Sequence, residues 1–117
     1  MQKTGEYYEH KALRFMQRRL WRLITQNYSC RFGEIDLIMQ TICRKRLAFI
    51  EVRYRDSEVF GGGIESVDIK KQRKIIKTAE HFLQQHPNYY EYDISFDVIC
   101  FNANNKLDWI HDAFRVE

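Results

Sequence analysis

Apolar positions spaced three and four residues apart mark the first predicted element of the chain. Between about Gly5 and Leu20 they recur among charged residues, at Tyr8, Ala12, Phe15 and Met16. This period places them on one face of an amphipathic helix. Thr4 directly precedes the pattern and suits an N-cap, because its hydroxyl accepts a backbone hydrogen bond in that position.

Three β-prone runs follow the predicted helix. They cover residues 21–30 (WRLITQNYSC), 31–41 (RFGEIDLIMQT) and 46–55 (RLAFIEVRYR). The connections between them are too short to hold a crossover helix. The three runs are therefore predicted to pair as an antiparallel meander.

The second half of the chain predicts a loop, a helix and a buried strand. Three consecutive glycines, Gly61–Gly63, interrupt residues 56–68 and indicate a mobile loop. From Asp68 apolar residues return at helical spacing, and they stop before Pro87. The run ISFDVICF, residues 94–101, is typical of a buried strand, and a turn and a short terminal segment, LDWIHDAF, follow it. The predicted order is helix, three strands, helix, strand, which is an α/β fold.

Composition narrows the class of protein. With 117 residues, of which 44% are hydrophobic and 30% charged, the chain has the size and composition of one domain, residues 1–117. No apolar run approaches the roughly 20 residues that cross a bilayer, and the N-terminus has no signal-peptide pattern, so a cytoplasmic protein without membrane contact is expected. An odd number of cysteines and the lack of paired histidine spacing argue against a disulfide framework and a zinc site, and predict free thiols.

The formal net charge of +3 is unevenly distributed along the chain. Basic residues gather in three clusters: Lys11, Arg14, Arg18, Arg19 and Arg22; Arg44, Lys45 and Arg46; and Lys70, Lys71, Arg73, Lys74 and Lys77. Alone, such clusters are typical of solvated surfaces. Beside a site for phosphate chemistry they favour nucleic-acid binding.

Two of the predicted strands carry acidic side chains at alternating positions. Alternation puts Glu34 and Asp36 on one face of GEIDLI, and it puts Glu51 and Arg53 on one face of FIEVRYR. If these strands pair with those faces aligned, Asp36 and Glu51 converge beside Arg53. Carboxylates among apolar residues need neutralisation, either by a divalent cation such as Mg²⁺ or Mn²⁺ or by a cross-strand salt bridge with Arg53. Strand spacing leaves both alternatives open.

Six segments of the chain resemble the motifs of one bacterial protein family. In order, they are TGEYYE, GEIDLI, FIEVRYR, KKQR, FDVI and IHDAF, and they run from Thr4 to Phe114. Together they resemble the YraN family. An acidic strand residue followed by Glu-x-Arg on the next strand is similar to the site of the PD-(D/E)XK nucleases, which include Holliday-junction resolvases. The resemblance implies a restriction-endonuclease-like core, with a mixed central sheet flanked by helices.

The same resemblance implies catalytic and metal-binding roles for particular residues. Asp36 and Glu51 correspond to ligands of Mg²⁺ or Mn²⁺, and the backbone carbonyl of Val52 corresponds to a further ligand. Glu9 corresponds to a helix glutamate near the metal and Gln72 to a glutamine near the phosphate, although solvated helix positions remain the alternative for both. Hydrogen bonds or ion pairs that support the fold are expected of the two other motif acids, Glu34 and Asp97.

Arg53 stands where the nuclease superfamily usually has lysine. Arginine keeps its proton at physiological pH, so it cannot act as a general base, but it can offset charge on a phosphate. Two functions therefore stay open. One is a metal-dependent nuclease acting on DNA, branched or single-stranded, with a homodimer expected if it cuts duplexes. The other is a non-catalytic module that binds nucleic acid or a protein partner, which the sequence does not identify.

Overall fold

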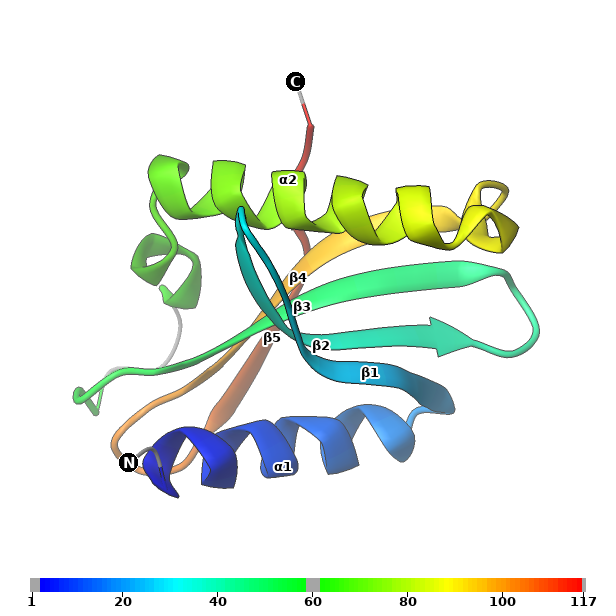
Figure 1. The fold of residues 1–117 in the computed structure, drawn as a ribbon. Coiled ribbons are helices and arrows are strands. Elements are labelled where there is room, and N and C mark those ends of the chain that lie inside the picture. The colour runs from blue at the N-terminus through cyan, green and yellow to red at the C-terminus, as the bar shows by residue number, and fades with distance from the viewer. Residues whose placement is uncertain (1–2, 59–61, 117) are drawn as a thin grey trace.

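The computed structural model of the protein describes residues 3–58 and 62–116. A five-stranded sheet lies between two α-helices, with one helix on each face (Figure 1), which confirms the expected α/β class. The elements are α1 (Lys3–Gln17), β1 (Trp21–Cys30), β2 (Gly33–Thr41), β3 (Arg46–Tyr54), the 3-10 helix η1 (Gly63–Ser66), α2 (Ile69–Gln85), the 3-10 helix η2 (Pro87–Tyr89), β4 (Asp93–Phe101) and β5 (Leu107–Phe114).

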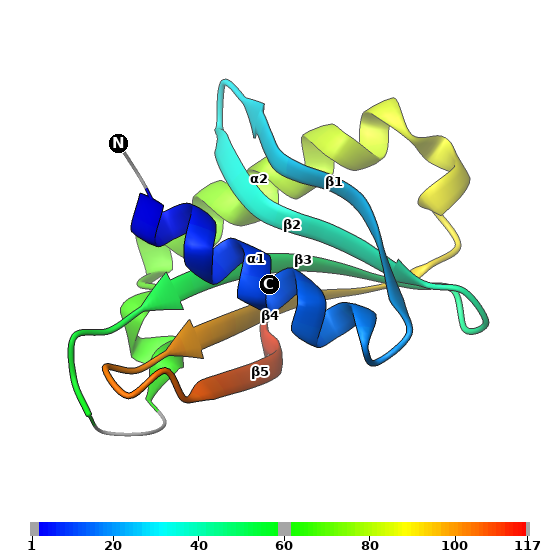
Figure 2. The same cartoon turned by 90° about the horizontal axis from the view of Figure 1, so that it is seen from below.

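The sheet is mixed, in the order β1-β2-β3-β4-β5 (Figure 2). The first three strands pair antiparallel in sequence order, as the short connections predicted. β3 and β4 are parallel, in register from Arg46 opposite Asp93 to Tyr54 opposite Phe101. A parallel neighbour needs a long crossover, and α2 lies within it. β5 then returns antiparallel to β4 at the edge of the sheet.

Strand alternation divides the apolar side chains between two layers. On β3, Phe49 packs in the layer that contains Phe82 of α2. Its neighbours Ala48 and Ile50 point to the other face, into the layer that contains Met16 of α1. β4 is buried along most of its length, because helices cover both faces of the sheet there.

Two local features fix α2 against the sheet. Asp68 caps the helix, because its carboxylate accepts a hydrogen bond from the Lys71 N–H at 2.8 Å. The turn between β1 and β2 rises towards the middle of α2 (Figure 1), where a Cβ added to Gly33 would lie 3.3 Å from the Thr78 hydroxyl. Gly33 has φ of 151°, and its lack of a side chain permits this close approach.

Three features differ from the sequence expectations. The terminal segment LDWIHDAF, predicted without an element of its own, forms the fifth strand. α1 already includes Thr4 and ends at Gln17, so Thr4 lies inside the helix and is not its N-cap. The predicted mobile loop contains η1, while residues 59–61 of that loop lie outside the described part of the chain.

The cysteines are free thiols, as predicted: Cys30, Cys43 and Cys100. In the described ranges, neither α-helix has the length and apolar character that crossing a membrane requires.

Candidate functional site

β2 and β3 separate at the position of the candidate carboxylates. Their last ladder pair joins Leu37 to Ile50. One residue beyond it, an Asp36 carboxylate oxygen accepts a hydrogen bond from the backbone N–H of Val52 at 2.8 Å. The side chain thus takes the place of a ladder bond. The structure brings Asp36, Glu51 and Val52 together, as the predicted strand pairing required.

Two cations flank the Glu51 carboxylate. Arg53 Nε lies 3.5 Å and Lys71 Nζ 3.8 Å from the same Glu51 oxygen, Oε2. The Glu51 side chain is only 7% exposed, whereas the two cations are about one third exposed, at 33% and 35%. Arg53 Nε is buried and makes no hydrogen bond within the described residues, although it lies within ion-pair range of Glu51.

The two cations offset the negative charge of the carboxylates incompletely. Burial, together with the charge of Asp36, raises the pKa of Glu51 from 4.5 to about 7, against the opposing effect of Lys71 and Arg53. Burial also raises the pKa of Asp36, although the Val52 hydrogen bond and the same cations oppose the shift. The pair therefore favours taking up a positive charge, either a proton or an external cation.

Glu9 of α1 belongs to the same electrostatic cluster. Burial and the nearby charge of Asp36 raise the pKa of Glu9, and an interaction with the Asn27 side chain opposes this shift. The charge of Glu9 in turn contributes to the raised pKa of Glu51. The cluster thus includes the helix glutamate that the family motif indicated.

Gln72 lies apart from the carboxylates. Its side-chain amide donates a hydrogen bond to the Val67 carbonyl at 3.0 Å, and it lines a different hollow along α2. The α2 residue beside Glu51 is Lys71. Sequence reasoning counted Lys71 only among the basic residues of that segment, since five cations occur there and only the packing of α2 decides which one points to the sheet.

An open hollow of about 540 Å³ adjoins the carboxylates. Charged residues of both signs line it, among them Arg31, Asp36, Glu51, Lys71 and Lys74. Within residues 3–58 and 62–116, no group of three or more His, Cys, Asp or Glu side chains is placed to hold a metal ion. A cation held by Asp36 and Glu51 would take its further oxygen ligands from the backbone and from water.

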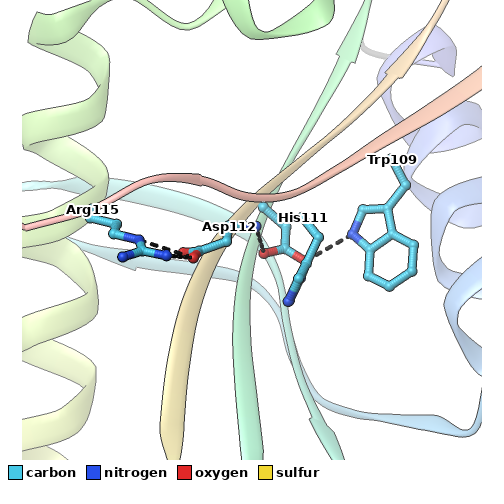
Figure 3. A network of polar contacts seen from close by, with 5 residues as sticks. Trp109, His111, Asp112 and Arg115 are labelled. Carbon is cyan, nitrogen blue, oxygen red and sulfur yellow. Dashed lines mark hydrogen bonds and ion pairs between the residues drawn. The ribbon is translucent and has the colours of Figure 1, made fainter.

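A second polar network joins β4 to β5 (Figure 3). The buried Asp97 carboxylate accepts hydrogen bonds from Trp109 Nε1 at 2.8 Å, from His111 Nδ1 at 3.0 Å and from the Asp112 N–H at 3.1 Å. Asp112 also pairs with Arg115. Asp97 therefore supports the fold by hydrogen bonding, as its motif predicted.

A basic hollow of about 720 Å³ runs along the exposed side of α2. Among the described residues that line it, five are cations and one, Glu80, is an acid; the cations are Lys70, Arg73, Lys74, Lys77 and Arg115. Lys74 also lines the hollow at the carboxylates, so the two hollows meet at this residue.

Fold and site together define a class: a mixed-sheet α/β protein with two converging carboxylates on adjacent strands, flanked by an arginine and by a lysine from the crossover helix. The chain belongs to the uncharacterised protein family UPF0102, whose sequence profile matches residues 8–101. Membership of an uncharacterised bacterial family, expected from the motifs, is thereby confirmed. The matched range includes Glu9, Asp36, Glu51 and Arg53.

Relatives from three bacteria resemble nearly the whole chain. The UPF0102 protein of Psychromonas ingrahamii is 46% identical over 112 residues, which are 95% of this chain and 88% of the relative. The relative from Nitrosococcus oceani is 43% identical over 116 residues, which are 97% of this chain and 92% of the relative. The relative from Stutzerimonas stutzeri is 40% identical over 117 residues, which are 97% of this chain and 96% of the relative. Each relative is named only as a member of the same family.

Proposed function

We propose that the protein is a metal-dependent phosphodiesterase of the PD-(D/E)XK nuclease superfamily that acts on DNA, branched or single-stranded, through a restriction-endonuclease-like core. The observation that carries the proposal is the pKa of Glu51, raised to about 7 by burial and by Asp36 although two cations lie within 4 Å. A purely structural salt bridge would hold that carboxylate in its charged form. A site that still lacks positive charge is suited to binding a cation.

The residues present fit a hard divalent cation. Carboxylate and carbonyl oxygens are the ligands that Mg²⁺ and Mn²⁺ prefer, and Asp36, Glu51 and the Val52 carbonyl would hold the ion. When bound, such an ion supplies a more acidic water molecule and offsets charge on a phosphate. The hydrogen bond that the Val52 N–H donates to Asp36 Oδ2 orients the Asp36 carboxylate.

The chain's own cations supply the remaining chemistry of the proposal. The Arg53 side chain is one third exposed, so its guanidinium can offset charge on a phosphate while its buried Nε faces Glu51. Lys71 adds a compact, partly exposed charge on the other side of Glu51. Burial and Asp36 raise the pKa of Glu9, so the negative charge of the cluster acts on α1 as well as on the two strands.

A non-catalytic module that binds nucleic acid or a protein is the second candidate function. It is favoured by the two ion pairs of Glu51, which already offset part of its charge. Within the described residues, the small number of side-chain ligands at Asp36 and Glu51 also favours it. In this alternative the basic hollow along α2 would bind a phosphate backbone, and no bond would be cut.

Cleavage of labelled branched, flapped and single-stranded DNA in Mn²⁺ and in Mg²⁺ tests the proposal. The wild type should cut at least one of these substrates, and Asp36→Asn and Glu51→Gln should abolish cutting. Glu91→Gln is the matched control, because its side chain is 83% exposed in an ion pair with Lys45. If the wild type cuts none of the substrates with either ion, the non-catalytic function is correct.

A further inference from the structure

Three tyrosines form an exposed aromatic surface next to the candidate site, here called the tyrosine platform: Tyr7, Tyr8 and Tyr54. Tyr8 stacks on Tyr54 with ring centroids 4.8 Å apart and an interplanar angle of 18°. Tyr7 meets Tyr8 edge to face at 5.0 Å. Tyr7 is 49% and Tyr54 40% exposed, so two of the three rings present aromatic surface to solvent.

Contacts with β4 and with the turn that follows it hold Tyr8 of the platform in place. Tyr8 packs against the buried Phe101 of β4, with centroids 4.8 Å apart. Its hydroxyl donates a hydrogen bond to the Asn105 side chain at 3.0 Å. A rigid aromatic surface loses little conformational entropy when a flat ligand stacks on it.

The platform adjoins the carboxylate cluster. Tyr8 precedes Glu9 on α1, and the charge of Glu9 acts on Glu51. Tyr54 follows Arg53 on β3, but strand alternation points its ring to the face of the sheet that α1 covers, away from Glu51 and Arg53. The start of α1 and the end of β3 lie at the same end of the molecule in both views (Figures 1 and 2). A ligand that covers the platform therefore lies on the α1 side of the sheet and meets the cluster at Glu9.

Basic side chains continue the platform along α1. Lys11 Nζ lies 3.4 Å from the Tyr7 hydroxyl and 5.2 Å from the centre of its ring. The exposed Arg14 follows on this helix face, and the exposed Arg18 comes directly after the end of the helix. Aromatic rings next to a line of cations are the surface that binds single-stranded nucleic acid, because the rings stack on bases and the cations contact phosphates.

We infer that the tyrosine platform, with Lys11 and Arg14, binds an unpaired strand of DNA and delivers it to the candidate site. Bases in a duplex already stack on one another, so exposed tyrosine rings can accept only bases that are unpaired. The delivery step rests on the proposed function, whereas the binding step does not. The inference selects single-stranded segments from the substrates proposed above.

Fluorescence anisotropy with two labelled DNAs tests the binding step in EDTA at one fixed salt concentration. One is an oligothymidylate of about 15 nucleotides, near the upper site size of single-strand binding folds. The other is a blunt hairpin of the same length. The double variant Tyr7→Leu, Tyr54→Leu keeps apolar bulk but removes the rings. It should weaken oligothymidylate binding about tenfold or more and leave hairpin binding nearly unchanged.

Two controls isolate the stacking of the rings. Tyr7→Phe, Tyr54→Phe keeps the rings and should retain oligothymidylate binding. Tyr90→Leu removes a ring that is 65% exposed, and it should also retain binding. Tyr90 directly follows η2, and η2 lies at the opposite end of the molecule from the start of α1 (Figure 1). Tyr7→Leu alone repeats the test at the more exposed of the two rings, with a smaller loss, if the double variant does not fold. The inference is overturned if the wild type does not bind oligothymidylate. It is also overturned if the double variant binds both DNAs with wild-type affinity, or if its affinity for both DNAs falls equally.

The two failures can be told apart by adding Asp36→Asn and a cleavage assay. In one outcome, oligothymidylate binding depends on the tyrosines and persists in Asp36→Asn, but no cleavage occurs. That outcome would contradict the proposed function alone. In the other outcome, the wild type cleaves DNA but the double tyrosine variant binds oligothymidylate with the same affinity as the wild type. That outcome would contradict this inference alone.

Discussion

At neutral pH the Glu51 carboxyl divides between its charged and neutral forms, because burial and Asp36 raise its pKa from 4.5 to about 7. The folded protein then binds the proton more tightly than the unfolded chain does. The stabilisation is fully present below about pH 4.5 and is lost as the pH rises through about 7. In EDTA, the free energy of unfolding of the wild type should therefore fall across this range relative to that of Glu51→Gln, measured by urea denaturation at several pH values.

Glu91→Gln is the control for that comparison, since an exposed carboxylate should leave the pH dependence unchanged. Adding Mn²⁺ above pH 7 should restore stability to the wild type and not to Glu51→Gln, because an ion that binds only the folded state stabilises it. Identical pH profiles for the wild type and Glu51→Gln would contradict the raised pKa of Glu51.

Arg53 separates a catalytic site from a structural ion pair. If the Arg53 guanidinium contacts a phosphate oxygen, Arg53→Ala should lower the rate of DNA cleavage by roughly 10² or more, the scale for removing one preorganised donor, with little change in DNA affinity. Arg53→Lys should keep or raise the rate, because an ammonium also offsets charge. Cleavage in Mn²⁺ with thermal melts alongside measures both effects. A lower melting temperature for Arg53→Ala, with no cleavage by any of the variants, would instead identify a salt-bridge partner.

Among elements, β5 depends on the Asp97 network. Asp97→Asn keeps the size of the side chain but replaces one acceptor oxygen with a donor, so its NH2 group faces either the donors of Trp109 and His111 or the Asp112 N–H unfavourably. The free energy of unfolding should fall by about 2 to 4 kcal/mol. Asp112→Asn should cost about 1 kcal/mol or less, because it loses only the exposed pair with Arg115. Urea denaturation of both variants measures the difference, and equal losses would contradict the role of Asp97.

The same strand shows why the sequence predicted some elements and not others. β1, β2 and β3 followed from apolar alternation and short connections. In β5 the register shifts opposite β4: Phe96 pairs with Phe114, but Val98 pairs with Ile110. Residues 111–113 therefore bulge around Asp97 and break the period of two that marks a strand. A bulge that depends on a partner strand leaves no local pattern in the sequence.

The candidate site was predictable to a similar extent. The convergence of Asp36 and Glu51 follows from alternation and strand pairing, both local properties of the sequence. The ion pair of Lys71 with Glu51, and the hydrogen bond of Gln72 to Val67 instead, follow from the way α2 packs on the sheet. That packing involves residues far apart in the sequence and leaves no signature in a helix segment that holds five cations.

For the whole molecule, the basic hollow along α2 predicts non-specific binding of DNA that depends on salt. Each neutralised phosphate of duplex DNA contributes about −0.9 to the slope of log affinity against log salt concentration. Replacing the exposed Arg73 and Lys77 with glutamine should therefore reduce the magnitude of the slope by about 2. Lys45→Gln is the control, because Lys45 lies in the β2–β3 turn and pairs with Glu91. Anisotropy titrations at several salt concentrations give the slope, and a flat slope in the wild type would contradict binding through phosphates.

The parallel pairing of β3 with β4 also bears on the order in which the chain folds. The meander of β1, β2 and β3 closes through short turns, whereas the β3–β4 pairing must wait for a long crossover, so we expect the meander to form first. Asp36 and Glu51 belong to the meander, but Lys71 arrives with the crossover. During synthesis the acids and Arg53 thus precede Lys71, and the ion pair between Glu51 and Lys71 forms only when the second half of the protein has docked.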